Sequence, residues 1–306
     1  MSTDPHDERV RPQDAHDEIL DALVASYQGP ELINNLDTYA LPNRRAVIQA
    51  FSHIQHLMFL GFFSTRRLEP SSLRLALAEH LMGAQEILTE QIRRAAEWED
   101  RQLPPDEQRH EGWCLEATQQ LLREVPEIRR KLYGDIQSAY ANDPAAGSIE
   151  EIVFSYPGVL AVTAYRVAHV LHRLDVPMIP RIIAAHAHAR TGVDIHPAAR
   201  IGERFFIDHG TGVVIGATSV IGDDVKLYQG VTLGAISVRT DTPRDGRNPA
   251  KRHPTLRDGV TVYAGSTILG GDTIVGARSV IGGNVWLTQS VAPDSKIYRK
   301  SDTQKK

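Results

Sequence analysis

Two short segments of the sequence bring together side chains that can move protons or bind charged groups. The first is Asp208-His209-Gly210-Thr211-Gly212, and the second is Arg252-His253-Pro254. A histidine whose pKa lies near neutrality can take a proton from a hydroxyl group. A planar guanidinium can bind a carboxylate through two parallel hydrogen bonds. His209 is therefore a candidate base, and Arg252 is a candidate group for binding an anion.

A six-residue repeat surrounds both segments. Aliphatic residues lie six apart at positions 195, 201 and 207, then at 215, 221, 227 and 233, and again at 269, 275, 281 and 287. Seven aliphatic–glycine pairs accompany them, which a general sheet would not require. A helix cannot produce this spacing because its own period is about 3.6 residues. The repeat predicts short strands and tight corners that stack as a parallel β-helix with an aliphatic core.

The repeat is interrupted where the chemistry-bearing segments lie. The step from Ile207 to Ile215 is eight residues instead of six. The two extra residues must bulge outward because a close-packed core has no room for them, and glycines 210 and 212 permit the tight backbone of such a bulge. We therefore expect His209 outside the prism, where a neighbouring subunit can form the other wall of a site. Residues 234–255 also leave the repeat, as a functional loop or as a solvated excursion.

The part of the chain before residue 190 has a helical pattern. Apolar residues recur there at helical spacing, and Pro104-Pro105 marks a break. Helices are predicted over 112–140, 158–174 and 180–190. The fold class is therefore α+β, an N-terminal all-α helical domain followed by the parallel β-helix. The domains are predicted as a disordered segment 1–14, a helical domain 15–190, a β-helix domain 191–292 with an extruded loop 234–255, and a tail 293–306.

Composition excludes several classes of protein. Lys and Arg number 34 against 38 Asp and Glu, a net charge of −4 that argues against nucleic-acid binding. Cys114 is the only cysteine, so neither an intrachain disulfide nor a Cys-based zinc site can form, and the cytoplasm is the expected location. The N-terminus is polar and acidic, unlike a signal peptide. The most apolar stretch, 46–63, contains Gln and His and is short for a membrane span, which predicts a buried helix.

The motifs follow the order and spacing of one family. Residues 140–290 resemble the serine O-acetyltransferase family of hexapeptide-repeat transferases through DIHPAARIG, DHGTGVVIG, GVTLG, KRHP, ILGG and VGARSVIGG. The resemblance implies a left-handed β-helix, an exception to the right-handed crossover rule, and a homotrimer or dimer of trimers with each active site between two prisms. It also implies acetyl transfer from acetyl-CoA, a co-substrate and not a resident cofactor, to the L-serine hydroxyl. The products, O-acetyl-L-serine and CoA, belong to the first step of cysteine biosynthesis.

The resemblance assigns the catalytic and ammonium-binding residues. His209 is the general base, and Asp194 corresponds to the carboxylate that orients it, 15 residues earlier and so close to one 18-residue turn away. Asp143 and Asp208 match the aspartates that bind the ammonium group of serine, although Asp143 alone also fits a turn that ends a helix. Because Cys114 lies outside the repeats, we expect direct attack in a ternary complex.

The remaining site residues are assigned in the same way. Arg252 matches the residue that binds the serine carboxylate, and His253 assists it. Gly234, Ala264 and Gly283 match small positions beside the pantetheine arm of CoA, although tight corners would also select small residues. The loop 234–255 is expected to cover the neighbouring site and to contact the CoA phosphates. No metal is implied.

Three other functions remain open at this stage: a carbonic-anhydrase-like zinc enzyme, an acyltransferase with another acceptor, and a non-catalytic scaffold. A zinc site at a trimer interface needs three histidines from the coils, whereas His186 and His188 fall in the predicted last helix. Some members of the family bind O-acetylserine sulfhydrylase through a tail that ends in Ile. This sequence ends in Lys306, so that complex is not expected. L-cysteine, which resembles serine, is the expected feedback inhibitor.

Overall fold

The computed structural model describes residues 12–29, 33–37, 40–65, 67–236 and 250–299. The chain divides into two compact units, residues 1–41 and 42–306. The first unit contains α1 (Pro12–Tyr27). This helix starts inside the segment predicted to be disordered, because proline suits a first helical turn, where no N–H partner is needed. Residues 1–11 of that segment lie outside the described residues.

The second unit begins with helices. They are α2 (Arg44–Phe63), α3 (Leu73–Asp100), the short 3₁₀-helix η1 (Pro105–Glu107), α4 (Trp113–Asn142), α5 (Ile149–Ser155), α6 (Pro157–Arg173) and α7 (Ile179–Thr191). Local signals set their ends. The Asn43 side chain accepts hydrogen bonds from two N–H groups at the start of α2, and Ser148 caps α5. The helical prediction for this part of the chain is confirmed.

Helix α2 is long and apolar enough to cross a membrane, judged by length and composition alone. Its buried residues Val47, Phe51, Ile54 and Met58 recur three or four positions apart and belong to the main hydrophobic core. Such a stripe on one face is typical of a helix that packs against a core. The prediction of a buried helix over 46–63 is therefore confirmed for this face.

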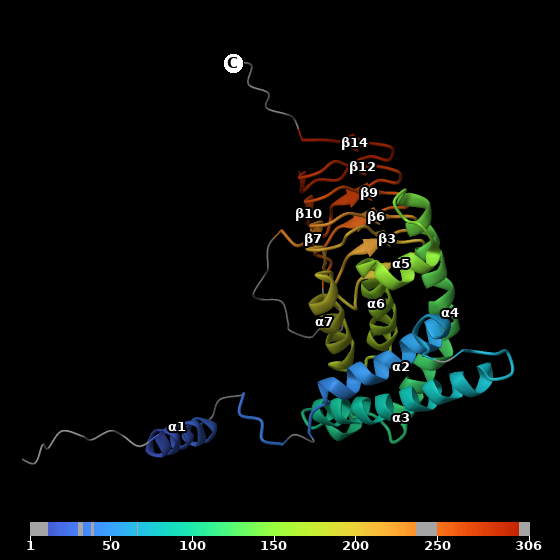
Figure 1. Cartoon of the computed structure of the whole chain (residues 1–306). Helices are drawn as coiled ribbons and strands as arrows, with labels where there is room; N and C mark the ends of the chain where they lie inside the picture. Colours follow the sequence, from blue (N-terminus) through green and yellow to red (C-terminus); the bar gives the residue numbers. More distant parts are fainter. Residues whose placement is uncertain (1–11, 30–32, 38–39, 66, 237–249, 300–306) are drawn as a thin grey trace, which may run out of the picture. The chain divides into compact units, whose positions relative to one another are not determined.

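Short strands follow the helices and wind round a triangular prism (Figure 1). They are β1 (Asp194–Ile195), β2 (Arg200–Ile201), β3 (Phe206–Ile207), β4 (Val214–Ile215), β5 (Val220–Ile221), β6 (Lys226–Leu227), β7 (Thr232–Gly234), β8 (Thr255–Leu256), β9 (Thr261–Val262), β10 (Thr267–Leu269), β11 (Ile274–Val275), β12 (Val280–Ile281), β13 (Trp286–Leu287) and β14 (Lys296–Ile297). They form three parallel sheets in the described residues: face A (β1-β4-β7-β10-β13), face B (β2-β5-β8-β11) and face C (β3-β6-β9-β12-β14). Because successive strands join successive faces, this is a three-sided parallel β-helix, consistent with the predicted left-handed one.

The aliphatic residues that the repeat predicts to face the core do so, except at Leu269. Leu233 pairs with Ile268, which is fully buried, while the predicted core residue Leu269 pairs with Gly234 and is only partly buried. The next inward residue, Val275, is seven positions after Ile268 instead of six. Both 268 and 269 are aliphatic, so spacing alone selects the wrong one, and pairing with the preceding coil decides between them.

The coils also extend beyond the predicted end at residue 292. Strand β14 pairs with β12, and the N–H of Gly282 donates to the carbonyl of Ile297 at 2.7 Å. Ile297 lies 16 residues after Ile281, so the strict six-residue spacing does not reveal it. Residues 300–306 of the predicted tail lie outside the described residues.

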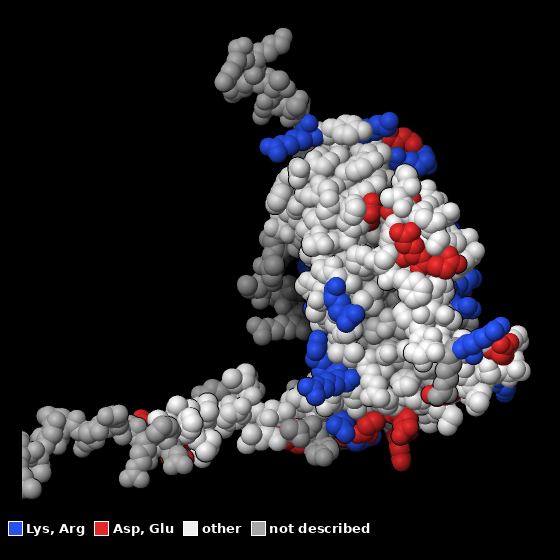
Figure 2. Space-filling view, in the orientation of Figure 1, with Lys and Arg blue, Asp and Glu red and all other residues white. Residues whose placement is uncertain are grey.

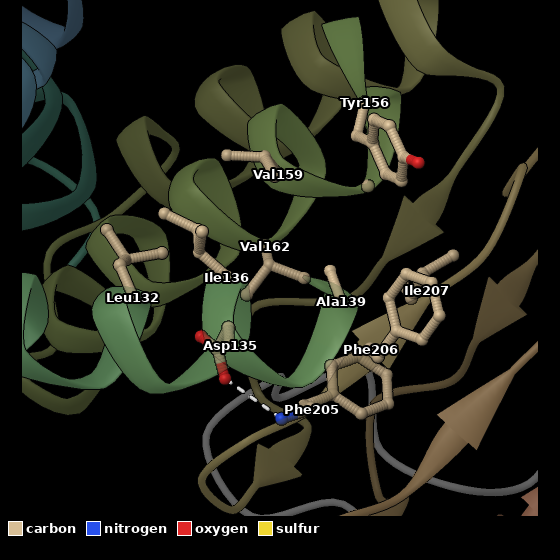
Figure 3. Close-up of a pocket in the computed structure, with 11 residues that line it drawn as sticks. Leu132, Asp135, Ile136, Ala139, Tyr156, Val159, Val162, Phe205, Phe206 and Ile207 are labelled. Atoms are coloured by element: carbon tan, nitrogen blue, oxygen red, sulfur yellow. Dashed lines mark hydrogen bonds between the residues drawn. The ribbon is translucent and has the colours of Figure 1, made fainter. Parts of the chain in front are cut away.

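Helices and prism share one buried core. The Asp135 carboxylate of α4 accepts two hydrogen bonds from Arg166 of α6, at 2.7 and 2.8 Å, and a third from the N–H of Phe205, at 2.9 Å. Arg166 also donates to the carbonyl of Gly202. Figure 3 shows this junction, where apolar side chains of α4, α6 and β3 surround a small cavity. The change at residue 190 is thus a change of secondary structure within a continuous core.

Candidate active site

The bulge predicted after β3 is present at the corner between faces C and A. The buried repeat residues Ile207 and Ile215 are eight positions apart there, instead of six. His209 adopts a positive φ of 57°, and its side chain is 68% exposed. A Cβ at Gly210 would lie 2.8 Å from Cγ2 of Val193, so the bulge lies against the residue that precedes β1, at the start of the first coil. The extra residues therefore present His209 on the outside of the prism, as predicted.

Two carboxylates and a tyrosine join His209 at this corner. Asp208 is 14% exposed, with Oδ1 3.8 Å from Nδ1 of His209. Asp143 ends α4, and its Oδ1 accepts the N–H of Ala145 at 2.8 Å, as expected of a helix-ending turn. The hydroxyl of Tyr156 donates to the other oxygen, Oδ2, at 2.5 Å. We call Asp143, Tyr156, Asp208 and His209 the His209 corner.

The two carboxyl groups differ in their electrostatic environment. The hydrogen bond from Tyr156 is the main cause that lowers the pKa of Asp143, with smaller contributions from the Ala145 N–H and from His209. Burial raises the pKa of Asp208, which the neighbouring Asp143 raises further. The same hydrogen bond raises the pKa of Tyr156 to about 12. The corner thus holds one firmly ionised carboxylate beside a second, less exposed one.

Asp194 lies near the same corner without contacting the histidine. It begins β1 and pairs with Val214, the first residue of β4. Its chain neighbour Val193 lies against the bulge. Among the hydrogen bonds and ion pairs of the described residues, none joins Asp194 to His209, and the contact to Nδ1 of His209 comes from Asp208. That Asp194 orients the imidazole stays a prediction.

A column of residues rises from the bulge along the corner. Tyr228 lies one coil above Asp208, and its ring stacks on Tyr263 of the next coil, with centroids 4.9 Å apart. Ala264 follows Tyr263, and a Cβ at Gly283 would lie 3.3 Å from the carbonyl oxygen of Ala264. Two of the predicted CoA positions therefore share the His209 edge. The third, Gly234, ends β7 at the other side of face A.

The second chemical segment lies at the corner between faces A and B. Residues 252 and 253 come just before β8, and the His253 ring lies on Gly216, where a Cβ would be 2.0 Å from Cδ2 of the ring. Thr218 contacts Nδ1 of that ring through its N–H and its hydroxyl. Burial, followed by the charges of Arg252 and Lys251, lowers the pKa of His253 to about 4. We call Gly216, Thr218, Arg252 and His253 the His253 corner.

The two corners carry complementary groups but lie apart within one chain. The His209 corner holds two carboxylates, and the His253 corner presents the exposed Arg252 guanidinium, which makes no ion pair with any residue of the described ranges. They occupy different edges of face A, and no hydrogen bond or ion pair between them occurs in the described part of the chain. One chain therefore presents these complementary groups on two separate edges.

Figure 2 shows acidic side chains over α5, whose first turn contains Glu150 and Glu151, while the prism in that view is largely uncharged. His186 and His188 lie in α7, as predicted. In the ranges that the structure describes, no group of three or more His, Cys, Asp or Glu could hold a metal ion. Residues 237–249 of the predicted loop lie outside those ranges.

Comparison with known proteins places this fold and these motifs in one family. No family model matches the chain. The curated protein "Serine acetyltransferase, plasmid" of Synechococcus elongatus is 41% identical over 308 residues, which cover 97% of this chain and 95% of that protein. The chain belongs to the serine acetyltransferase family. The serine acetyltransferase of Mycobacterium tuberculosis is 48% identical over a shorter stretch of 131 residues, 43% of this chain and 53% of that protein.

Solved serine acetyltransferases have the same architecture. The crystal structure of serine acetyltransferase isoform 3 from Entamoeba histolytica in complex with cysteine is 30% identical, with a TM-score of 0.71, over 94% of both chains. A second structure from that organism, serine acetyltransferase 1 in complex with L-cysteine, has a TM-score of 0.69 and covers 86% of this chain. The helices as well as the prism therefore follow the serine acetyltransferase fold.

Sequence reasoning missed three residues that shape the two corners. Tyr156 precedes a proline, which signals a helix start but gives no sign that its hydroxyl holds Asp143. Gly216 is one of the aliphatic–glycine pairs, so its role in seating a histidine ring is hidden by the repeat. Thr218 has no sequence signal, because the residues it contacts are 34 and 35 positions away.

Proposed function

We propose that this chain transfers an acetyl group from acetyl-CoA directly to the hydroxyl of L-serine, in a site built from the His209 corner of one copy and the His253 corner of a second. The observation that supports this is the separation of complementary groups on two edges of face A. In a closed ring of three copies, an edge of one prism can face the other edge of the next. A homotrimer is the smallest such assembly, and a dimer of trimers would keep the same sites.

The charged groups fit the two ends of an amino acid. The ionised Asp143 and the neighbouring Asp208 suit the ammonium group of serine. The exposed guanidinium of Arg252 on the second copy suits its carboxylate through paired hydrogen bonds. A serine molecule bound by its ammonium group and by its carboxylate would present its hydroxyl to His209. Those complementary charges favour an amino acid over a sugar as the acceptor.

The transfer itself requires a base that later acts as an acid. His209 takes the hydroxyl proton as serine Oγ attacks the thioester carbonyl carbon, with Asp208 or Asp194 stabilising the imidazolium that forms. The tetrahedral intermediate then loses the CoA sulfur, and the proton on His209 passes to that sulfur. The C–O bond forms as the C–S bond breaks, so no acetyl-enzyme is needed.

Small residues beside the reacting groups suit the CoA arm. Ala264 and Gly283 line the edge above His209, where they leave backbone groups accessible to the pantetheine amides. Gly234 would approach from the second copy. Acetyl-CoA is thus a co-substrate that binds along the edge between two prisms. The loop 234–255 contributes positive charge for its phosphates.

We expect L-cysteine to inhibit the reaction and the protein to work in the cytoplasm. The Entamoeba histolytica structures contain cysteine. L-cysteine carries the same ammonium and carboxylate groups as serine, so we expect it to compete for this site here. A single cysteine in the whole chain fits work in the cytoplasm.

Release of CoA in the presence of acetyl-CoA and a panel of amino acids tests the activity. We expect L-serine to be the preferred acceptor and His209→Ala to lose most turnover while staying oligomeric. Turnover that is insensitive to chelators would count against the zinc-enzyme alternative. If no amino acid supports CoA release, the proposed reaction is wrong.

Mixed oligomers test the shared site. His209→Ala and Arg252→Ala should each be inactive alone. When they are co-expressed at equal levels, random assembly should restore about a quarter of the sites, because an intact site needs His209 from one copy and Arg252 from the next. Activity that stays absent in verified mixed trimers would place both groups in one chain's site and refute the arrangement.

A further inference from the structure

Thr218 connects one coil of the prism to the segment that carries Arg252 and His253. It lies in the turn between β4 and β5. Its Oγ1 accepts the N–H of Arg252 at 2.9 Å and the N–H of His253 at 3.0 Å. Its carbonyl accepts a hydrogen bond from Nζ of Lys251 at 2.7 Å. Three consecutive residues are thus held by one threonine.

The same threonine determines where the His253 ring carries its proton. The N–H of Thr218 donates to Nδ1 at 3.1 Å, and Oγ1 lies 2.8 Å from Nδ1. A backbone N–H can only donate, so Nδ1 must be unprotonated. Since Oγ1 already accepts two N–H groups, its own hydrogen is available for Nδ1. The neutral ring therefore carries its proton on Nε2.

The rest of the ring's surroundings leave Nε2 available. The ring packs closely against Gly216, where a Cβ would be 2.1 Å from Nε2. Nε2 makes no hydrogen bond with a described residue. The buried side-chain atoms without a partner in those residues are the hydroxyls of Thr163 and Ser219, so Nε2 is accessible from outside. The charged and titratable groups around the ring are Arg252, Lys251 and His196. Two of these are cations, so the surroundings disfavour a second proton on the ring.

We propose that Thr218 is a positioning residue that fixes His253 as a neutral ring with a permanent Nε2–H donor, aimed at an oxygen of the bound amino acid. The inference rests on the proposed function and gives the two histidines different tasks. A ring whose Nδ1 accepts two hydrogen bonds and whose Nε2 carries hydrogen cannot take the substrate proton. His209, which is 68% exposed and has no backbone donor on its ring, is left as the base.

The tautomer can be measured without any assumption about the reaction. Long-range ¹H–¹⁵N spectra of the full chain labelled in histidine, with His253→Gln to assign the signal, should show Nδ1 unprotonated and Nε2 protonated at pH 6. Thr218→Val keeps the backbone N–H but loses the hydroxyl donor to Nδ1, which favours the neutral ring, so the pKa of His253 should rise from about 4, while burial and the neighbouring cations still hold it below the ordinary value of about 6.5. Thr218→Ser, which keeps the hydroxyl, should restore the wild-type spectrum. A wild-type ring with its proton on Nδ1 would overturn the proposal, even if Thr218→Val fails to fold.

Kinetics then test what the donor does. In Thr218→Val we expect kcat/KM for serine to fall roughly 10- to 100-fold, since hydrogen bonds that hold the ring and the loop are lost. The KM for acetyl-CoA should stay unchanged, and the loss of activity at acid pH should begin at a higher pH than in wild type, because the ring has lost one donor that favours its neutral form. Thr261→Val, an outward threonine on face C, is the matched control and should behave as wild type. An unchanged pH profile in Thr218→Val, or a Thr218→Ser variant that resembles Thr218→Val, would refute the inference. A wild-type protein inactive with serine would instead refute the proposed function and leave the spectra to decide the tautomer.

Discussion

The buried ion pair between Asp135 and Arg166 should be one of the strongest single determinants of stability. Its side chains are only 7% and 5% exposed. Asparagine at position 135 keeps the shape but removes the charge, so Arg166 would remain as an uncompensated buried cation. Removal of one partner of such a pair costs about 3–5 kcal/mol. The loss also weakens the bond to the N–H of Phe205, which precedes the strand leading to His209.

The chain contains a matched control for this substitution. Asp294 and Arg278 form a similar two-bond pair, with both distances 2.7 Å, but their side chains are 61% and 66% exposed. Both partners stay hydrated when that pair is broken, so Asp294→Asn should leave the unfolding midpoint within experimental error. Urea unfolding of both variants and of wild type, followed by far-UV circular dichroism, compares the two sites. Equal protein concentrations are needed because the apparent stability of a chain that assembles depends on its concentration.

The two results together decide whether burial controls the effect. We expect Asp135→Asn to lower the urea midpoint by roughly 1–2 M, with little change in slope. An Asp135→Asn midpoint no lower than that of Asp294→Asn would refute the reasoning. So would a large effect at the surface pair, because the geometry of the two pairs is nearly the same.

Two further predictions concern the corners. Tyr156→Phe removes the hydroxyl that keeps the pKa of Asp143 low, so the KM for serine should rise while the KM for acetyl-CoA stays the same. Initial rates at varied serine concentration measure this, and an unchanged KM for serine would contradict the role of Tyr156. His196 and His253 have pKa values of about 4 in the folded chain. As pH falls, these histidines bind a proton in the unfolded chain at about pH 6.5 but in the folded chain only near pH 4. The free energy of unfolding should therefore fall between pH 6.5 and 4, by roughly 3 kcal/mol for each histidine. Urea midpoints of wild type and His196→Gln across this range would check it, and a constant difference between them would rule out the contribution of His196.

The repeat in the sequence was sufficient to predict the prism and the bulge. A six-residue period has few physical explanations, and an eight-residue step within it must leave the core. The prediction was wrong where two aliphatic residues are adjacent, at Ile268 and Leu269, and where spacing changes, before Ile297. In both places the hydrogen-bonding partner on the preceding coil decides the register, and that partner is not visible in local sequence.

For the candidate site, too, the sequence specifies the residue types and the tertiary structure specifies which of them meet. The sequence by itself determined which residue types are available: a histidine in a glycine-flanked bulge, an arginine–histidine pair beside a loop, and aspartates that end a helix or precede the bulge. Only the tertiary structure decided that Asp143 and Asp208 meet at one edge while Arg252 and His253 occupy another. It also decided that the hydroxyl of Tyr156 keeps the pKa of Asp143 low and that the N–H of Thr218 donates to Nδ1 of His253. Residue type is encoded locally, but distance and protonation depend on neighbours that the winding of the chain brings from tens of positions away.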